Sequence, residues 1–107
     1  MNKDTAKAWI KAPGSSDEVM ERHSVIQRVF RRFQLRFTYR RAEVFVVMAR
    51  LGGEGATCKG IVQALRAAGR QDIGESTVYR VILDFVEAGL STKLCGQDRR
   101  TYYRIAV

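Results

Sequence analysis

Apolar residues recur every three or four positions over much of the chain, which is the spacing of one buried helix face. The first such stretch opens with Ser15 and Glu18, a pair with the spacing of a capping box. Its apolar stripe comprises Val19, Ile26, Val29, Phe30 and Phe33, with His23 on the same side. We expect a first helix that begins at this box, packs one face against the protein and leaves basic side chains in water.

Three more helices are predicted further along the chain. Thr38 and Thr57 precede the second and third apolar stripes and are suitable N-caps, because a threonine hydroxyl accepts a bond from a free backbone N–H. The fourth helix is expected from about Glu75 to Ala88. Glycines that can end these helices are Gly52, Gly69 and Gly89. The expected buried residues are Ala42, Phe45, Val46 and Ala49 in the second helix and Ile61, Val62 and Leu65 in the third.

After the fourth helix the apolar period changes to two, which is the period of strands. Residues 90–95 and 100–105 alternate in this way, and the connection between them contains Gly96 and Asp98, which favour turns. We therefore expect a β-hairpin with Arg99 and Arg100 near its tip.

The order of these elements is that of a winged helix-turn-helix, a mainly α fold that ends in a small β-hairpin, the wing. We expect one such domain over residues 15–107, preceded by a flexible basic arm at residues 1–14. The chain has 107 residues and a formal net charge of +8. Residues 28–41 contain six arginines and no acidic residue. Such a block most often binds phosphate or another anionic surface, and a solvated helix face is the alternative.

Several features limit the compartment and the chemistry. The longest apolar run, Val44 to Ala49, is far too short to cross a membrane, and the N-terminal residues lack the apolar segment of a secretory signal. Cys58 and Cys95 lie far apart in the sequence, which favours free thiols in a reducing compartment and offers no cysteine cluster for a metal. We expect a cytoplasmic protein.

The fourth helix has two different sides when it is projected at about 100° per residue. The seam expected to be buried comprises Val78, Val81, Ile82, Phe85 and Gly89, and the opposite side comprises Ser76, Tyr79, Arg80, Leu83 and Glu87, with Asp84 at its edge. Because Asp84 and Glu87 would repel phosphates, only the N-terminal end of this helix can enter a DNA groove.

The side chains at this end suit DNA. Arg80 can donate two bonds to a guanine edge or bind a phosphate, and Tyr79 can contact a thymine methyl or a phosphate. Ser76 and Thr77 are expected to bind the DNA backbone. The alternatives are burial of Tyr79 against the wing and an ion pair of Arg80 with Asp84.

Three segments carry a family resemblance: Leu35 to Arg41, Ser76 to Val81, and Glu87 to Leu90 ahead of the hairpin. Together they make residues 33–107 similar to the DNA-binding domain of the ferric uptake regulator (Fur) family. The resemblance implies a winged helix whose Tyr79 and Arg80 contact DNA. It also implies that Arg36 approaches the minor groove and that Arg41 touches the DNA backbone.

The sequence departs from this family in two respects. Family members continue past the wing into a dimerisation domain rich in His and Cys, whereas this sequence ends at Val107, so we expect the DNA-binding part alone. The family's metal site draws on a His before the third helix and a Glu at the end of the second wing strand. These positions read about Gly55 and Arg104 here, so no cofactor is evident.

Double-stranded DNA is the expected partner, and the resemblance implies a Fur-type, repressor-like transcription regulator at the bacterial nucleoid. Lys93, Arg99 and Arg100 of the wing, with Arg104, are expected on the solvent side to contact phosphates. Three assemblies are possible: a homodimer through Val19, Ile26, Val29 and Phe33 of the first helix, a heteromer with a full-length relative, and a weakly binding monomer.

Two other function classes fit the sequence less well. An enzyme is not expected, because the sequence has no nucleotide-binding loop, no Cys-His or Ser-His arrangement and no metal cluster. A winged helix that binds an acidic protein, such as a larger Fur-like regulator, is the alternative. An exposed Leu83 beside Tyr79 would suit that role.

Overall fold

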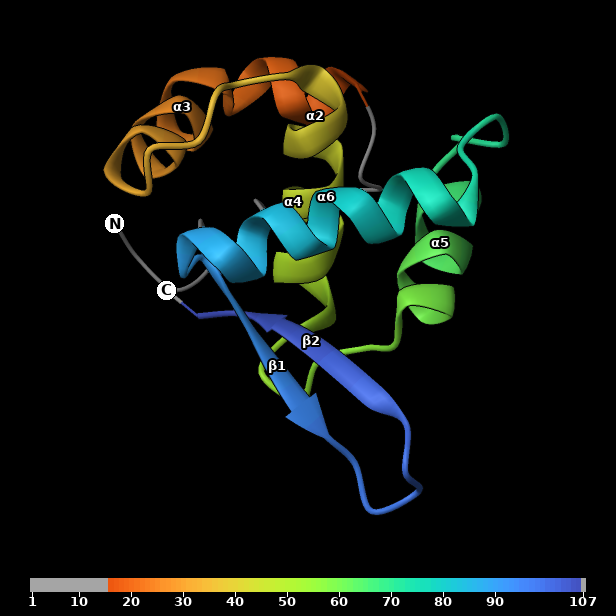
Figure 1. Cartoon of the computed structure of the whole chain (residues 1–107). Coiled ribbons are helices and arrows are strands. Elements are labelled where there is room, and N and C mark those ends of the chain that lie inside the picture. Colours follow the sequence, from red (N-terminus) through yellow and green to blue (C-terminus); the bar gives the residue numbers. More distant parts are fainter. Residues whose placement is uncertain (1–15, 107) are drawn as a thin grey trace.

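Five helices precede a two-stranded antiparallel hairpin in the computed structural model, which describes residues 16–106 (Figure 1). The helices are α2 (Ser16–Glu21), α3 (His23–Arg32), α4 (Tyr39–Leu51), α5 (Cys58–Ala67) and α6 (Glu75–Ala88), and the strands are β1 (Ser91–Cys95) and β2 (Thr101–Ile105). This arrangement confirms the predicted winged helix. None of the helices in residues 16–106 is long and apolar enough to cross a membrane.

The first predicted helix is divided into α2 and α3 at Arg22. Its stripe is nevertheless buried as expected, with Val19, Ile26 and Phe30 fully inaccessible to water. The ring of Phe30 lies 5.6 Å from that of Phe45 and 5.7 Å from that of Phe85, so α3 joins the core through aromatic contacts. The capping box proposed for Ser15 and Glu18 lies outside the residues whose side chains are described.

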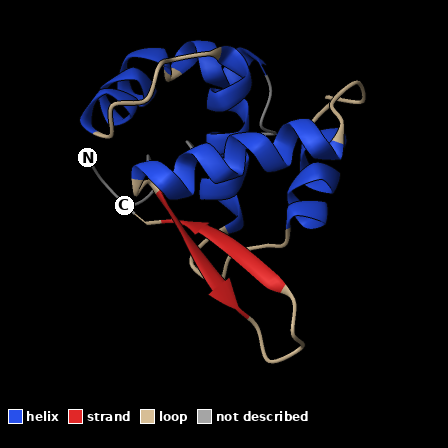
Figure 2. Ribbon diagram, in the orientation of Figure 1, coloured by secondary structure: helices blue, strands red, loops and turns tan. Residues whose placement is uncertain are grey.

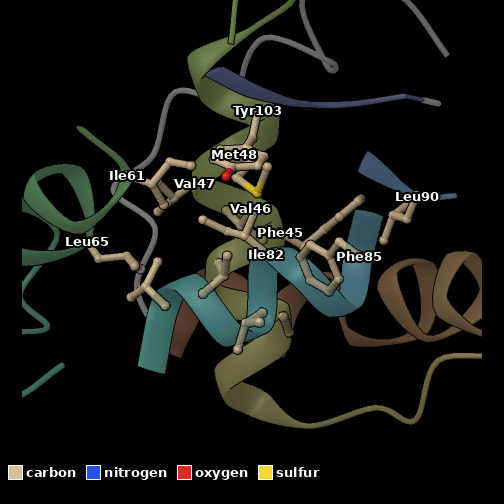
Figure 3. Packing of buried hydrophobic residues seen from close by; sticks show 14 of the residues in the cluster. Phe45, Val46, Val47, Met48, Ile61, Leu65, Ile82, Phe85, Leu90 and Tyr103 are labelled. Carbon is tan, nitrogen blue, oxygen red and sulfur yellow. The ribbon is translucent and has the colours of Figure 1, made fainter. Parts of the chain in front are cut away.

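Helix α4 is the centre of the fold. The hydroxyl of Thr38 accepts a bond from the backbone N–H of Arg41 at 3.0 Å, as expected of an N-cap, and Gly52 ends the helix with a φ of 85°. Every residue from Ala42 to Met48 is buried, so other elements cover the helix on all sides rather than along one stripe. Figure 3 shows its side chains meeting Ile82 and Phe85 of α6.

Helices α5 and α6 form the helix-turn-helix. Thr57 caps α5 by accepting a bond from the N–H of Gly60 at 3.0 Å. Helix α6 ends at Gly89, whose φ of 86° allows the N–H of Leu90 to bond the carbonyl of Phe85 at 2.9 Å. Leu90 is fully buried, which fixes the point where the chain enters the wing.

The hairpin extends away from the helices (Figure 2). Its register pairs Lys93 with Tyr103 and Thr92 with Arg104. Ala56, in the connection between α4 and α5, forms a bridge with Tyr103 on the open edge of β2. The base of the wing is therefore held from two sides, by Leu90 and by Ala56.

Candidate nucleic-acid interface

Helix α6 has one buried and one exposed side, in agreement with its sequence pattern. Val78, Ile82 and Phe85 are fully buried. Ser76 and Arg80 are exposed, and 44% of the Tyr79 surface is accessible. Thr77 lies between the two sides and is half-buried. The N-terminal half of α6 thus presents hydroxyl, phenol and guanidinium groups to solvent.

Tyr79 stands beside the base of the wing. Burial is the main cause that raises the pKa of Tyr103, and the neighbouring Tyr79 and Cys58 add to it. Cys58, Glu75, Ser76 and Tyr79 together line a hollow of about 540 Å³. Burial and the nearby Glu75 also raise the pKa of the Cys58 thiol, which keeps the sulfur protonated and chemically quiet. The tyrosine is therefore supported on one side and accessible on the other.

The expected alternative for Arg80 was an ion pair with Asp84, and the structure gives Asp84 a different partner. Its Oδ2 lies 3.1 Å from Nη2 of Arg41. Within residues 16–106 Arg80 takes part in no ion pair. Its guanidinium is available at the surface, next to Tyr79.

Arg41 connects the start of α4 to α6. Besides the ion pair with Asp84, its Nη1 donates a bond to the carbonyl oxygen of Arg36 at 2.8 Å. The Arg36 side chain itself is exposed. Arg41 therefore holds the segment before α4 in place, and its contact with the DNA backbone stays a prediction, as does the approach of Arg36 to the minor groove.

The wing tip is a tight, hydrogen-bonded turn. Asp98 Oδ2 accepts a bond from the Tyr102 hydroxyl at 2.7 Å, and Oδ1 accepts one from the backbone N–H of Arg100 at 3.0 Å. These bonds, the one from Tyr102 first, lower the pKa of Asp98. Arg99 adopts a left-handed φ of 67°. The turn presents two exposed arginines, Arg99 and Arg100, in defined positions.

The remaining basic residues of the wing differ from one another. Lys93 is exposed, on the face of the hairpin that also carries Tyr103. Arg104 lies on the other face and is half-buried rather than freely solvated, because its Nη1 donates to the carbonyl oxygen of Gly53 at 3.2 Å. Sequence reasoning missed this role, since nothing in the local pattern points to Gly53.

The homodimer through the first helix, one of the three possible assemblies, stays untested, and the burial of the residues named for it limits the surface they offer. Val19 and Ile26 are fully buried, and Val29 and Phe33 pack against the same core. The chain's own core therefore covers Val19 and Ile26, whereas Val29 and Phe33 stay half-buried. The alternative role as a protein-binding winged helix relied on an exposed Leu83 beside Tyr79. Leu83 is half-buried, so this support is weaker.

The two positions at which the family resemblance implies metal ligands do not fit a metal ion. Gly55 has no side chain, and Arg104 is a cation that already donates to a carbonyl. No group of three or more His, Cys, Asp or Glu residues with metal-binding geometry occurs in residues 16–106. The described residues therefore offer no ligand set of the family's kind.

A helix-turn-helix with a hairpin wing and a basic, exposed end of its second helix is the architecture of winged-helix DNA-binding proteins. The sequence model of the ferric uptake regulator family matches residues 32–107, and the chain belongs to this family, whose members are transcription regulators. No curated protein matches the chain.

Two solved structures share the fold. The ferric uptake regulator of Vibrio cholerae, in which rearranged DNA-binding domains are described, superposes with a TM-score of 0.65 at 22% identity, over 76% of this chain and 61% of that one. The ferric uptake regulator of Helicobacter pylori, described with three functional metal-binding sites, gives a TM-score of 0.61 at 21% identity, over 90% of this chain and 61% of that one. The chain thus spans about 61% of the length of either relative.

Proposed function

We propose that this chain is a Fur-type transcription regulator, acting as a repressor at the bacterial nucleoid, that reads double-stranded DNA with the N-terminal end of α6. The observation that carries the proposal is the exposure of Tyr79 and Arg80 on the outer side of a helix whose other side is fully buried. An arginine without an internal ion pair can give both donors to a guanine edge. The tyrosine ring can contact a thymine methyl.

Only the first two turns of α6 take part in this reading. Asp84 and Glu87 follow on the same helix, and phosphates would be repelled by them if the helix lay flat along the duplex. Entry by the N-terminal end also points the positive end of the helix dipole at the DNA. Ser76 and Thr77 then lie where they can donate to the sugar-phosphate backbone.

The wing and the segment before α4 supply contacts that do not depend on sequence. Lys93, Arg99 and Arg100 are exposed on the hairpin, and Arg36 is exposed ahead of α4. Contacts of this kind set the affinity and the position of the protein, whereas the base edges set the specificity. A single winged module reads a short half-site, so we propose that strong selectivity requires a heteromer with a full-length relative.

The proposal is tested by selecting bound fragments from random duplex DNA and measuring affinity for the selected duplex against a scrambled one. For the wild type we expect an enriched motif. The variant Tyr79→Ala/Arg80→Ala should lose the preference for the motif and keep a residual, salt-sensitive affinity, since each good base contact contributes about 1–3 kcal/mol of discrimination.

Tyr39→Ala/Arg40→Ala is the matched control, because it removes another exposed tyrosine and arginine, at the start of α4. It is expected to keep the enriched motif. If the Tyr79→Ala/Arg80→Ala variant binds with unchanged preference, α6 is not the reader. If the wild type binds an acidic protein and no duplex, the function is protein docking.

A further inference from the structure

The loop between α4 and α5 is fitted closely to β2 of the wing (Figure 1). The N–H of Ala56 donates to the carbonyl of Tyr103 at 3.0 Å, and the N–H of Tyr103 donates to the carbonyl of Ala56 at 2.8 Å. This pair of bonds adds one residue of a third strand to the hairpin.

Gly55 makes that approach possible. Its φ is 80°, and a Cβ at this position would lie 2.8 Å from the carbonyl oxygen of Tyr103. A side chain here would push the loop away from the strand. The loop and the wing are therefore shaped to each other at the position where the family resemblance implies a metal-binding histidine.

Arg104 makes a second contact between the same two segments. It follows Tyr103 in β2, and its Nη1 donates to the carbonyl oxygen of Gly53 at 3.2 Å. The bond joins residues 51 positions apart in the sequence. Arg104 stands where the resemblance implies the family's metal-binding glutamate, so a guanidinium, which has no acceptor atom to offer a metal ion, takes the place of a carboxylate.

We propose that Arg104 is a positioning residue that fastens the wing to the α4–α5 loop and sets the angle of the hairpin without a metal ion. The hydrogen bond from the guanidinium to the Gly53 carbonyl joins these two segments with the chain's own groups. Its consequence for DNA rests on the function proposed above, because a fixed wing holds Arg99 and Arg100 in place for the phosphates. The fastening itself is independent of DNA.

The remaining anchors of the wing let the proposal be tested without unfolding the protein. Leu90 is fully buried and does not depend on the Arg104 donors, and the Ser91 hydroxyl donates to the backbone carbonyl, not the side chain, of Arg104 at 2.8 Å. Arg104→Met keeps an unbranched apolar side chain close to the length of the arginine's aliphatic part and removes the donors. Arg104→Lys keeps a cation that can reach a carbonyl.

The experiment is amide hydrogen exchange on the full chain, followed residue by residue by NMR. In Arg104→Met we expect the amides of Ala56 and Tyr103 to exchange about five to ten times faster than in the wild type, while amides in α4 and α6 are unchanged. Arg104→Lys should restore part of the protection. Arg28→Met, which removes a cation on the exposed side of α3, should leave these two amides unchanged.

The same exchange experiment tests whether a metal ion contributes to the position of the wing. Protection of Ala56 and Tyr103 in the wild type should be equal with a chelator present and with added zinc or ferrous ion. Slower exchange on metal addition would overturn the proposal, and so would equal exchange in the wild type and Arg104→Met. A uniform increase over all helices would also overturn it, because that result reports general destabilisation.

Duplex binding is measured in parallel to separate this proposal from the proposed function. Faster local exchange in Arg104→Met, with no duplex bound by either protein, supports the fastening and contradicts the DNA-binding function. Unchanged exchange together with intact duplex binding contradicts the fastening and supports the function.

Discussion

The ion pair between Glu43 and Arg70 allows a stability prediction at the turn that leads into the proposed reading helix. Glu43 lies in α4 with 1% of its surface exposed, and its Oε2 is 3.1 Å from Nη1 of Arg70, in the turn between α5 and α6. Arg70→Met keeps an unbranched apolar side chain and removes the guanidinium. The buried carboxylate then loses this cation.

The loss of unfolding free energy expected for Arg70→Met follows from the burial of the Glu43 carboxylate. Removing one partner of a buried ion pair costs about 3–5 kcal/mol of unfolding free energy. The Arg70 side chain is 27% exposed, so water reaches one side of the pair and screens it. We therefore expect a loss of about 2–3 kcal/mol. For a domain of this size the melting temperature should fall by roughly 10–20 °C.

Urea unfolding followed by circular dichroism measures this free energy. Asp72→Asn is the control, because Asp72 lies 3.5 Å from Arg70 Nε but is 72% exposed, and its change should stay below about 0.5 kcal/mol. Glu43→Met/Arg70→Met should recover most of the loss, since it leaves no buried charge. The reasoning is refuted if Arg70→Met lies within about 0.5 kcal/mol of the wild type.

Three further results are expected. If about five exposed basic residues meet phosphates, the logarithm of the DNA affinity falls against the logarithm of salt concentration with a slope of about −5, and a slope shallower than about −2 contradicts the phosphate contacts. Thr38→Ala removes the N-cap of α4 and should lower the free energy of unfolding, measured in urea, by about 1 kcal/mol. An unchanged free energy of unfolding would mean that the cap is dispensable. Because the Tyr102 hydroxyl is the main cause that lowers the pKa of Asp98, Tyr102→Phe should move that pKa up towards its ordinary value in an NMR titration of the carboxyl carbon. The hydrogen bond from the Tyr102 hydroxyl to the Asp98 carboxylate orders the wing tip at neutral pH, and this order is lost as the pH falls through the lowered pKa of Asp98. A wing tip that is unchanged in acid would contradict this role of the bond.

Local signals in the sequence were enough to predict most of the fold. Thr38 and Thr57 act as N-caps, Gly52 and Gly89 end helices, and the change to a period of two marks the hairpin. Each of these features depends on residues a few positions apart. The break at Arg22 could not be seen, because the apolar stripe continues in phase across it.

Contacts between distant segments could not be predicted in the same way. A glutamate is seldom buried, and Glu43 is buried because other elements pack on every side of α4. The bond of Arg41 to Asp84 spans 43 positions, and the local pattern offered only Arg80, four residues before Asp84, as an alternative partner for that carboxylate. The exposed side of α6 was predictable, since a helical projection sorts its side chains without knowledge of the rest of the fold.

The most direct test of the proposed reading of DNA changes single atoms in the major groove. In the selected duplex, each guanine is replaced in turn by 7-deazaguanine, which lacks the N7 acceptor, and each thymine by uracil, which lacks the methyl group. We expect one or two positions at which the substitution weakens wild-type binding by about five- to a hundredfold and leaves binding by Tyr79→Ala/Arg80→Ala unaffected. Equal losses in both proteins at every position would contradict the proposed reading of DNA.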